Sequence, residues 1–369
     1  MAHQRGLVDI VFTSGGRLSA SDFVTDVDVK ITGIASYRKL VSSTAHAYSI
    51  CSLQSINGNY ATVSTDEQSK KYSAIFSVTA GKINTINITY DVTLPIEYMA
   101  TGCIKANTKS SGKWVIDTEN RVNTSTKTSS AYYFSGNNLT NYFGPQSSLG
   151  SGILCNDNKT YHFPSKQEFV SIIPCTLHLA TSPTLWDYSG QETETEIRFG
   201  AISTDRSYTS YWAADGKTMY AIRFVGTIYC SAWRYECESA VTGGGMIIKV
   251  KYLGKNVTTS NAASYLNTVK ASGYNWSSTD VVVRLLPGAG FSPSTVGEGY
   301  TTSHSELGNR VRYTSITSDY TANGNSYYWE FLVNSNAPWA YIGDANAWHG
   351  CIWDGSGRTL RLWLDPNQL

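Results

Sequence analysis

Residues 161–174 read Tyr161-His162-Phe163-Pro164-Ser165-Lys166-Gln167-Glu168-Phe169-Val170-Ser171-Ile172-Ile173-Pro174. Ser165 and Glu168 form a capping box, in which a hydroxyl and a carboxylate satisfy backbone donors at the start of a helix. An apolar stripe with i, i+3, i+4 spacing begins at Phe169, and Pro174 ends the helix. The stretch predicts one of the few helices in this chain. A second, weaker helix pattern covers about residues 260–270, with Tyr265, Leu266 and Val269 facing inward and Gly273 as a stop.

Most of the other patterned sequence has the two-residue period of half-buried strands. This period is present from Val8 to Phe12 and again around residues 27–31. Residues 72–78 alternate into the turn at Ala80-Gly81-Lys82 and residues 86–92 alternate out of it, which predicts an antiparallel hairpin. Short β-branched or alternating runs predict further strands at residues 220–225, 246–253, 281–286 and 359–364.

The chain has 369 residues, more than one hydrophobic core usually serves, so two domains are expected. The strand pattern lapses after Pro95, and the next stretch is crowded with Ser, Thr, Asn and Gly. We therefore expect a β-sandwich domain over residues 1–95 and an α+β domain with two helices over residues 96–369. Only 15% of the residues are charged, which suits the mainly β fold class.

Composition also argues against several classes of partner. The formal net charge is +1 and no Lys/Arg-rich stretch occurs, so nucleic acid is not an expected partner. No apolar run reaches the length of a transmembrane segment. The start at residues 1–6 lacks the apolar core of a signal peptide.

The seven cysteines include no C-x-x-C pair, so a structural zinc site is not expected. Cys230 and Cys237 flank an aromatic segment at a spacing that would allow a disulfide to close a short hairpin. Free buried thiols that behave as small apolar residues are the alternative.

Catalytic and metal-binding patterns are weak throughout. Glu192, Glu194 and Glu196 alternate along a predicted strand and would share one face, as a cation site or an acid/base pair would require. We interpret them as a solvated strand face. Gly243-Gly244-Gly245 leads into a strand rather than a helix, so it predicts a turn and not a phosphate site. There is no H-E-x-x-H and no G-x-S-x-G motif, and we expect no enzyme activity, no metal and no cofactor.

Aromatic and polar residues cluster near the C-terminus in a segment without regular alternation. Flat rings stack on sugars or anchor protein interfaces, while amides and carboxylates fix the orientation of a ligand. Trp329 and Trp363 lie in predicted strands and are expected to be core residues. The candidate ligand-binding residues are Trp339, Tyr341, Asp344, Asn346, Trp348, His349, Trp353 and Asp354.

Several motifs resemble one known family, in the same order along the chain. Residues 161–169 resemble the helix start of the Fibrobacter succinogenes major paralogous domain and its lectin-like relatives. Similar segments follow at residues 220–224 with 231–235, 282–291, 327–329 and 358–363. The resemblance covers roughly residues 95–369, and it implies a C-type-lectin-like fold in which two helices pack on short sheets. The calcium-binding tripeptides of true C-type lectins do not occur here.

Residues 7–93 resemble the β-sandwich pilin domains of Bacteroidetes fimbrillin-type surface proteins. Together the two resemblances imply a non-catalytic adhesin or fimbrial tip subunit that binds a host or bacterial glycan or protein and also contacts other pilin subunits. Such a protein would be secreted as a lipoprotein to the outer-membrane surface, with its signal peptide missing from this sequence.

Two other functions stay open. The clustering of Trp, Tyr, Ala, His and Asp at residues 337–354 also fits a hypervariable receptor-binding protein, of a phage or a cell surface, that is diversified in its lectin-like loops. An enzyme of the formylglycine-generating type has a related fold. It would need a reactive cysteine pair, for which Cys230 with Cys237 or Cys351 are the candidates.

Overall fold

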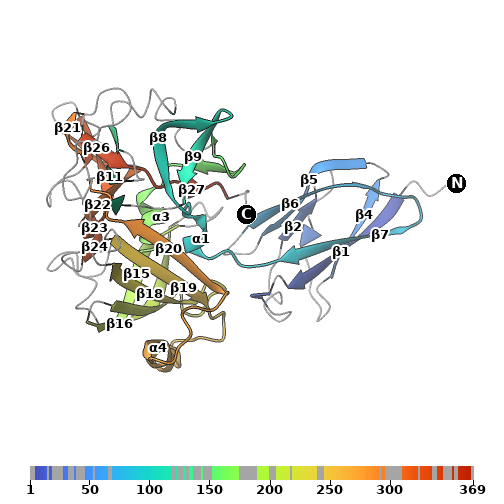
Figure 1. Cartoon of the computed structure of the whole chain (residues 1–369). Coiled ribbons are helices and arrows are strands. Elements are labelled where there is room, and N and C mark those ends of the chain that lie inside the picture. Colours follow the sequence, from blue (N-terminus) through green and yellow to red (C-terminus); the bar gives the residue numbers. More distant parts are fainter. Residues whose placement is uncertain are drawn as a thin grey trace.

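The computed structural model describes most of the strands and helices of the chain. The described residues are 5–14, 16–18, 28–31, 37–38, 46–52, 55–64, 69–118, 122–123, 128–129, 133–135, 143, 152–173, 189–198, 205–216, 218–238, 245–290, 292–295, 310–322, 325–334, 339–343, 351–352 and 356–366. The fold is mainly β, with antiparallel sheets and a few short helices, as the composition and the strand patterns predict. Figure 1 shows the strands of residues 5–90 on one side of a larger part that contains the other elements.

The N-terminal strands form two sheets. One has the order β4-β1-β7, with β1 (Arg5–Ser14), β4 (His46–Ser52) and β7 (Ile83–Tyr90). The other has the order β3-β2-β5-β6, with β2 (Asp28–Ile31), β3 (Tyr37–Arg38), β5 (Ser55–Ser64) and β6 (Ser69–Ser77). The predicted alternation is present in part in β1: Val8 and Ile10 are buried and Leu7 and Val11 are partly exposed, but Asp9 between Val8 and Ile10 is buried as well.

The predicted hairpin over residues 72–92 is wrong in its pairing. Both strands exist, but β6 pairs with β5, whereas β7 runs parallel to β1 in the other sheet. Alternation identifies a strand, but it does not identify its neighbour, because both strands of any pair show the same period. Here the parallel partner of β7 lies at the start of the chain.

The larger part contains a six-stranded sheet in which consecutive strands pair antiparallel. Its order follows the sequence: β15 (Gly190–Ile197), β16 (Arg206–Asp215), β17 (Thr218–Arg223), β18 (Ser231–Glu238), β19 (Gly245–Tyr252) and β20 (Val281–Pro287). Helix α4 (Ala262–Lys270) packs against β16 and β17 and buries Leu266 and Val269, as predicted, while Tyr265 stays half-buried.

A second large sheet has seven strands with the path β12-β26-β22-β23-β24. Its members are β12 (Tyr133–Ser135), β21 (Ser292–Thr295), β22 (Arg310–Ala322), β23 (Asn325–Asn334), β24 (Trp339–Gly343), β25 (Cys351–Ile352) and β26 (Ser356–Thr359). Three small sheets are formed by β8 (Cys103–Ser110) with β9 (Lys113–Asp117), by β10 (Val122–Asn123) with β11 (Thr128–Ser129), and by β13 (Ile153–Leu154), β14 (Thr160–His162) and β27 (Trp363–Leu364). The strand predicted at residues 359–364 is thus divided between β26 and β27.

The described residues form three helices, one more than the two predicted. The capping box is confirmed: α3 (Lys166–Val170) begins after Ser165, whose Oγ accepts from the backbone N–H of Glu168. This helix ends three residues before Ile173, and so it is shorter than predicted. The unpredicted helix α1 (Pro95–Tyr98) is a single turn whose N-terminus is held by the Glu97 carboxylate, which accepts from Leu94 N–H at 2.7 Å.

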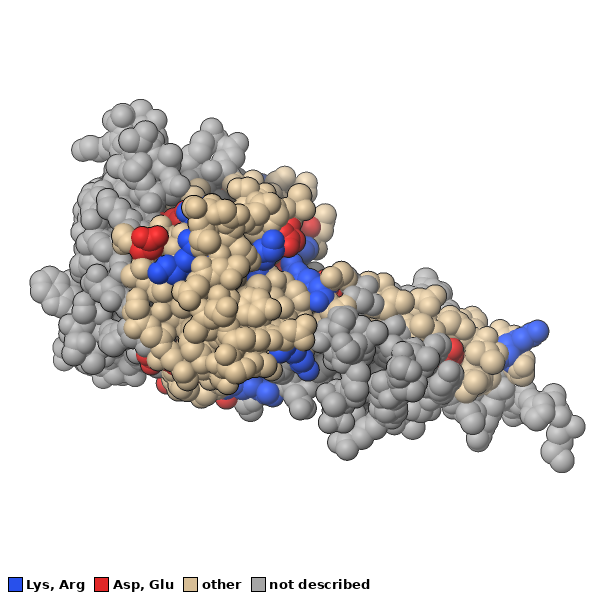
Figure 2. All heavy atoms as spheres, turned by 90° about the horizontal axis from the view of Figure 1, so that it is seen from below, with Lys and Arg blue, Asp and Glu red and all other residues tan. Residues whose placement is uncertain are grey.

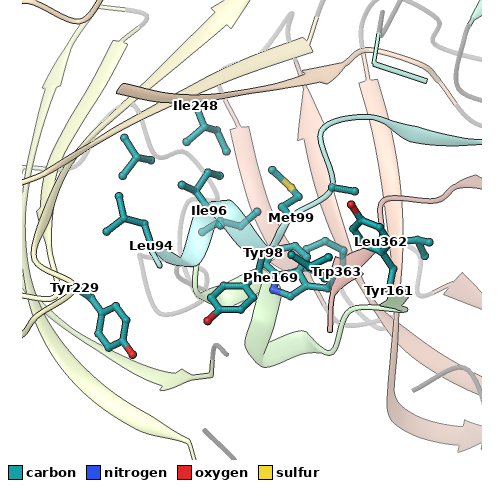
Figure 3. Packing of buried hydrophobic residues seen from close by; sticks show 14 of the residues in the cluster. Leu94, Ile96, Tyr98, Met99, Tyr161, Phe169, Tyr229, Ile248, Leu362 and Trp363 are labelled. Carbon is teal, nitrogen blue, oxygen red and sulfur yellow. The ribbon is translucent and has the colours of Figure 1, made fainter. Parts of the chain in front are cut away.

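The main hydrophobic core lies around α1. Figure 3 shows Tyr98 and Met99 near Phe169 of α3 and Trp363 of β27, while Ile96 lies toward Leu94 and Ile248. The rings of Phe169 and Trp363 meet edge to face, with centroids 5.8 Å apart. Full burial of such side chains contributes about 1.5–3 kcal/mol each, so this cluster holds α1, α3 and the C-terminal strand together.

Candidate functional site

Of the eight predicted binding residues, the structure describes two, and both lie in a strand of the seven-stranded sheet. Trp339 and Tyr341 lie in β24, which pairs antiparallel with β23. Asp344, Asn346, Trp348, His349, Trp353 and Asp354 lie outside the described residues.

Strands β24 and β25 follow the same edge of β23, one after the other. In β24, Gly343 pairs with Glu330, and in β25, Cys351 pairs with Tyr328. Only Trp329 separates these two partners on β23. Both ends of the segment 344–350, which contains four of the candidate residues, are therefore fixed to neighbouring positions of one strand.

On the opposite edge of β23, the pairing with β22 is interrupted at Trp329. Thr314 pairs with Glu330 and Ser318 with Tyr328, so residues 315–317 of β22 lie opposite Trp329 alone. The backbone N–H of Ile316 leaves the sheet and donates to the carbonyl of Pro164 at 2.9 Å. This break is thereby anchored to the residue that precedes the capping box of α3, as expected for a bulge that has a structural role.

The N-terminus of α3 is held by a histidine between two carboxylates. His162 Nε2 lies 2.8 Å from Glu168 Oε1, and Nδ1 lies 2.8 Å from Asp365 Oδ1. Burial alone would lower the pKa of His162, but the two carboxylates outweigh it and raise the pKa to about 10. Burial alone would raise the pKa of Asp365, yet its hydrogen bond with His162 lowers it. At neutral pH the imidazolium therefore donates to both carboxylates and ties the chain after β27 to α3.

A buried arginine holds the other end of α3. Arg223 of β17 donates to the carbonyl of Val170 at 2.9 Å and to Glu194 Oε2 at 2.6 Å. Tyr235 of β18 accepts from Arg223 and donates to the carbonyl of Ile172 at 2.7 Å. The last carbonyls of a helix lack partners within the helix, and these side chains supply them.

Arg223 and Glu194 are both fully buried. The guanidinium also lies 4.6 Å from the ring centre of Trp233 and 4.8 Å from that of Phe224. Burial would lower the pKa of Arg223, but the attraction of Glu194 outweighs it and raises the pKa. A sealed pair of this kind is a packing group, because it has no route to a ligand in solution.

The solvated face predicted for the three glutamates is therefore wrong for Glu194. The ladder between β15 and β16 is irregular from Glu194 to Ile197, and Glu196 has φ +59°. This irregularity breaks the two-residue period on which the shared face depended. Glu196 instead pairs with Lys166 of α3 at 2.6 Å.

Among the described residues, three cysteines are free and buried: Cys103, Cys155 and Cys230. A disulfide from Cys230 to Cys237 is thereby excluded, and the buried-thiol alternative holds for Cys230. Burial raises the pKa of the Cys230 thiol to about 12, although a backbone hydrogen bond from Gly226 opposes the shift. A reactive cysteine requires the opposite shift, toward the thiolate.

The described part of the chain contains no group of three or more His, Cys, Asp or Glu residues that could hold a metal ion. None of its helices is long and apolar enough to cross a membrane. On the face shown in Figure 2, basic side chains occur in separate small groups between larger uncharged areas.

Two buried charge arrangements that hold α3 escape sequence reasoning. The capping box reveals Glu168, but the contact of His162 with Asp365 joins residues 203 apart in the chain, and Arg223 meets Glu194 across 29 residues. The sequence does contain one signal for such pairs, which is an isolated charged residue in an apolar strand. Arg223 within Tyr220-Ala221-Ile222-Arg223-Phe224 is an example.

The comparisons with known proteins identify a family. Residues 91–348 match the model of a family described as a domain of unknown function, DUF8237. This match covers more than half of the chain, so the protein belongs to that family. No curated protein and no solved structure matches the chain.

Proposed function

We propose that this protein is a non-catalytic binding protein, a cell-surface adhesin or fimbrial tip subunit, that recognises a glycan or a protein through its C-terminal aromatic segment. The observation that carries the proposal is the register of β23. Gly343 pairs with Glu330 and Cys351 pairs with Tyr328, the two neighbours of Trp329 in β23. This pairing holds both ends of the segment that contains Trp348 and His349.

A scaffold of this kind suits recognition. Binding residues are most often found on connecting segments that a rigid framework positions. Here the framework is a sheet whose neighbouring strand β22 is hydrogen-bonded to the start of α3. A segment with fixed ends loses less conformational entropy on binding than one with free ends.

The titratable clusters in the described residues support a binding protein over an enzyme. His162 is engaged on both ring nitrogens, and Arg223 with Glu194 is sealed in the core. The protonated, buried Cys230 thiol argues against the formylglycine-generating type of enzyme. Export to the outer-membrane surface and contact with pilin subunits are part of the same proposal, and they depend on the family resemblances alone.

A hypervariable receptor-binding protein is the second candidate, and the same register favours it. A segment whose two ends are fixed by strand pairing can change its side chains without loss of the sheet. The discriminating observation is a nearby, nearly identical copy of the coding sequence for the region around residues 337–354, with substitutions confined to a few codons. Its presence favours the second candidate, and its absence favours the adhesin.

The proposal is tested with a glycan and host-protein array probed with the full chain. We expect at least one specific binder. Each of Trp339→Ala, Trp348→Ala and Trp353→Ala should then weaken binding by at least about tenfold, the effect of losing a central aromatic anchor. The control is Tyr265→Ala, which removes a half-buried ring from α4 and should leave binding unchanged. Binding that survives all three tryptophan changes would contradict the site assignment.

A further inference from the structure

Strand β20 lies at one end of the six-stranded sheet, and among the described strands it pairs only with β19. Its ladder is regular from Lys251↔Val281 to Gly245↔Pro287, without a bulge. Proteins usually interrupt such edges with bulges, prolines or charges, because a regular edge pairs readily with other strands. Strand β20 contains only one charged residue, Arg284, and one proline, Pro287 at its end, so most of its edge has no such interruption.

Two hydrogen bonds show which backbone groups point away from β19. Val281 N–H donates to Ser278, and the Val283 carbonyl accepts from Arg284 Nη1 at 3.0 Å, so neither group takes part in the ladder. In an antiparallel pair, alternate residues direct both backbone groups to the same side. Val281, Val283 and Leu285 therefore present their backbone groups along the outer edge.

The same three residues form an apolar stripe on the outer face of the sheet. Val283 is 47% exposed, and in the described part of the chain only Ile83, at 66%, is a more exposed large hydrophobic residue. Val281 and Leu285 are half-buried. The inner face of the strand differs, because Leu286 is buried and Val282 packs against the main core.

Cationic side chains border this stripe. Lys249 lies directly beside Val283, and Arg234 lies on the next strand beside Lys249. Both cations share the single carboxylate of Glu236. At the edge itself, Arg284 donates to the carbonyls of Met99 and Val283. Burial, and the nearby Arg361, lower the pKa of Arg284 to about 10, although the carboxylate of Glu97 opposes the shift.

We propose that β20 accepts an extended, acidic segment of a partner protein as an additional strand of the six-stranded sheet. Main-chain hydrogen bonds to Val283 and Leu285 would supply affinity, and alternate side chains of the partner would lie on the apolar stripe or meet the cations. The surface is separate from the aromatic segment on β23 and does not depend on the function proposed for it.

The charges also argue against a second copy of this chain as the occupant. Antiparallel pairing of two β20 strands about Val283 would bring two Arg284 guanidinium groups close together, because Arg284 is next to Val283 in the strand. Like charges at an interface oppose association. An acidic segment removes this repulsion.

The test uses fluorescence anisotropy with the full chain and a labelled peptide in which Val and Glu alternate. Two control peptides have Lys in place of Glu, or a central Pro that prevents strand pairing. The variants are Val283→Glu and Lys249→Glu, with Lys82→Glu as a charge-matched control in the exposed turn before β7. Thermal unfolding confirms that each variant is folded.

We expect the Glu peptide alone to bind, with an affinity that falls as salt is added. Val283→Glu and Lys249→Glu should each weaken binding by about tenfold, and Lys82→Glu should not. If Val283→Glu lowers the melting temperature, Lys249→Glu, at a partly exposed position, decides the result. The proposal is overturned if the Glu peptide does not bind, if the Lys peptide binds equally, or if both β20-face variants bind like wild type. A dimer of the chain alone that Val283→Glu dissolves would also overturn it.

Discussion

His162 stabilises the fold through its charge. Its pKa rises from an ordinary value of 6.5 to about 10 in the folded chain, because Glu168 and Asp365 favour the imidazolium. A raised pKa in the folded state gives stability that is complete below about pH 6.5 and is lost as the pH rises toward about 10. The free energy of unfolding should therefore decrease across that window.

We expect His162→Gln to lower the free energy of unfolding at pH 7 by about 3 kcal/mol, because it leaves two carboxylates close together without their cation. The variant should also lose most of the decrease between pH 6.5 and 10. Chemical denaturation at several pH values measures both effects. A variant that retains the slope of the wild type would show that another group causes it.

Arg223 and Glu194 provide a second prediction at this scale. Arg223→Met leaves a buried carboxylate without its partner and should cost about 3–5 kcal/mol, as should Glu194→Met for the opposite charge. The double variant should cost much less than the sum of the two, because neither charge then remains buried. The exposed pair of Arg198 and Asp205, 2.7 Å apart, is the matched control.

Substitution of Arg198 by Ala should change the free energy of unfolding by less than about 1 kcal/mol, since solvent screens an exposed pair. Additive costs for Arg223→Met and Glu194→Met in the double-mutant cycle would contradict the account of a sealed, coupled pair.

At the scale of the elements, Gly245 at the start of β19 illustrates what the close approach of two paired strands requires. Its φ is +118°, and a Cβ atom there would lie 2.0 Å from the carbonyl oxygen of Leu286 in β20. We expect Gly245→Ala to lower the free energy of unfolding by more than about 2 kcal/mol, because the backbone has to move and the conformation is strained.

The control is Gly273→Ala after α4, where an added Cβ meets nothing within 4 Å. This variant should be neutral or slightly stabilising, because Ala restricts the unfolded chain. Thermal unfolding of both variants measures the contrast. Equal effects would indicate that the close contact of Gly245 with β20 is not what determines the cost.

The local elements were largely predictable, and their pairing was not. The capping box at Ser165 and Glu168 and the inward residues of α4 follow from contacts within a few positions, which the sequence records directly. The partner of β7 depends on which distant strand offers a matching apolar face. The parallel β1 does so, and no nearby pattern encodes it.

The whole molecule joins its N-terminal strands to the larger part through charged and apolar contacts. Arg17 binds Glu97 of α1 at 3.0 Å and the carbonyl of Val92 at 2.9 Å, and Val8, Ile10 and Ile88 belong to the same core cluster as Ile96. The family match begins at residue 91, just before α1. The domain boundary predicted at residue 95 stays a prediction.

The sequence proposes the residues of the candidate site but not how the chain brings them together. Aromatic and amide residues without strand alternation indicate a connecting segment. This pattern predicts Trp348 and Asn346 as binding residues from the sequence alone. The positions of the two segment ends beside Trp329 depend on the register of β23 with β24 and β25, which long-range pairing determines.

The most direct test of the binding proposal replaces residues 344–350 by an equal number of Gly and Ser residues in the full chain. The measurement is the affinity for the strongest binder found on the glycan and protein array. We predict that binding is lost while the melting temperature stays close to that of wild type, because the pairing of Gly343 and Cys351 with β23 is kept. Retention of wild-type affinity by this folded variant would contradict the proposal.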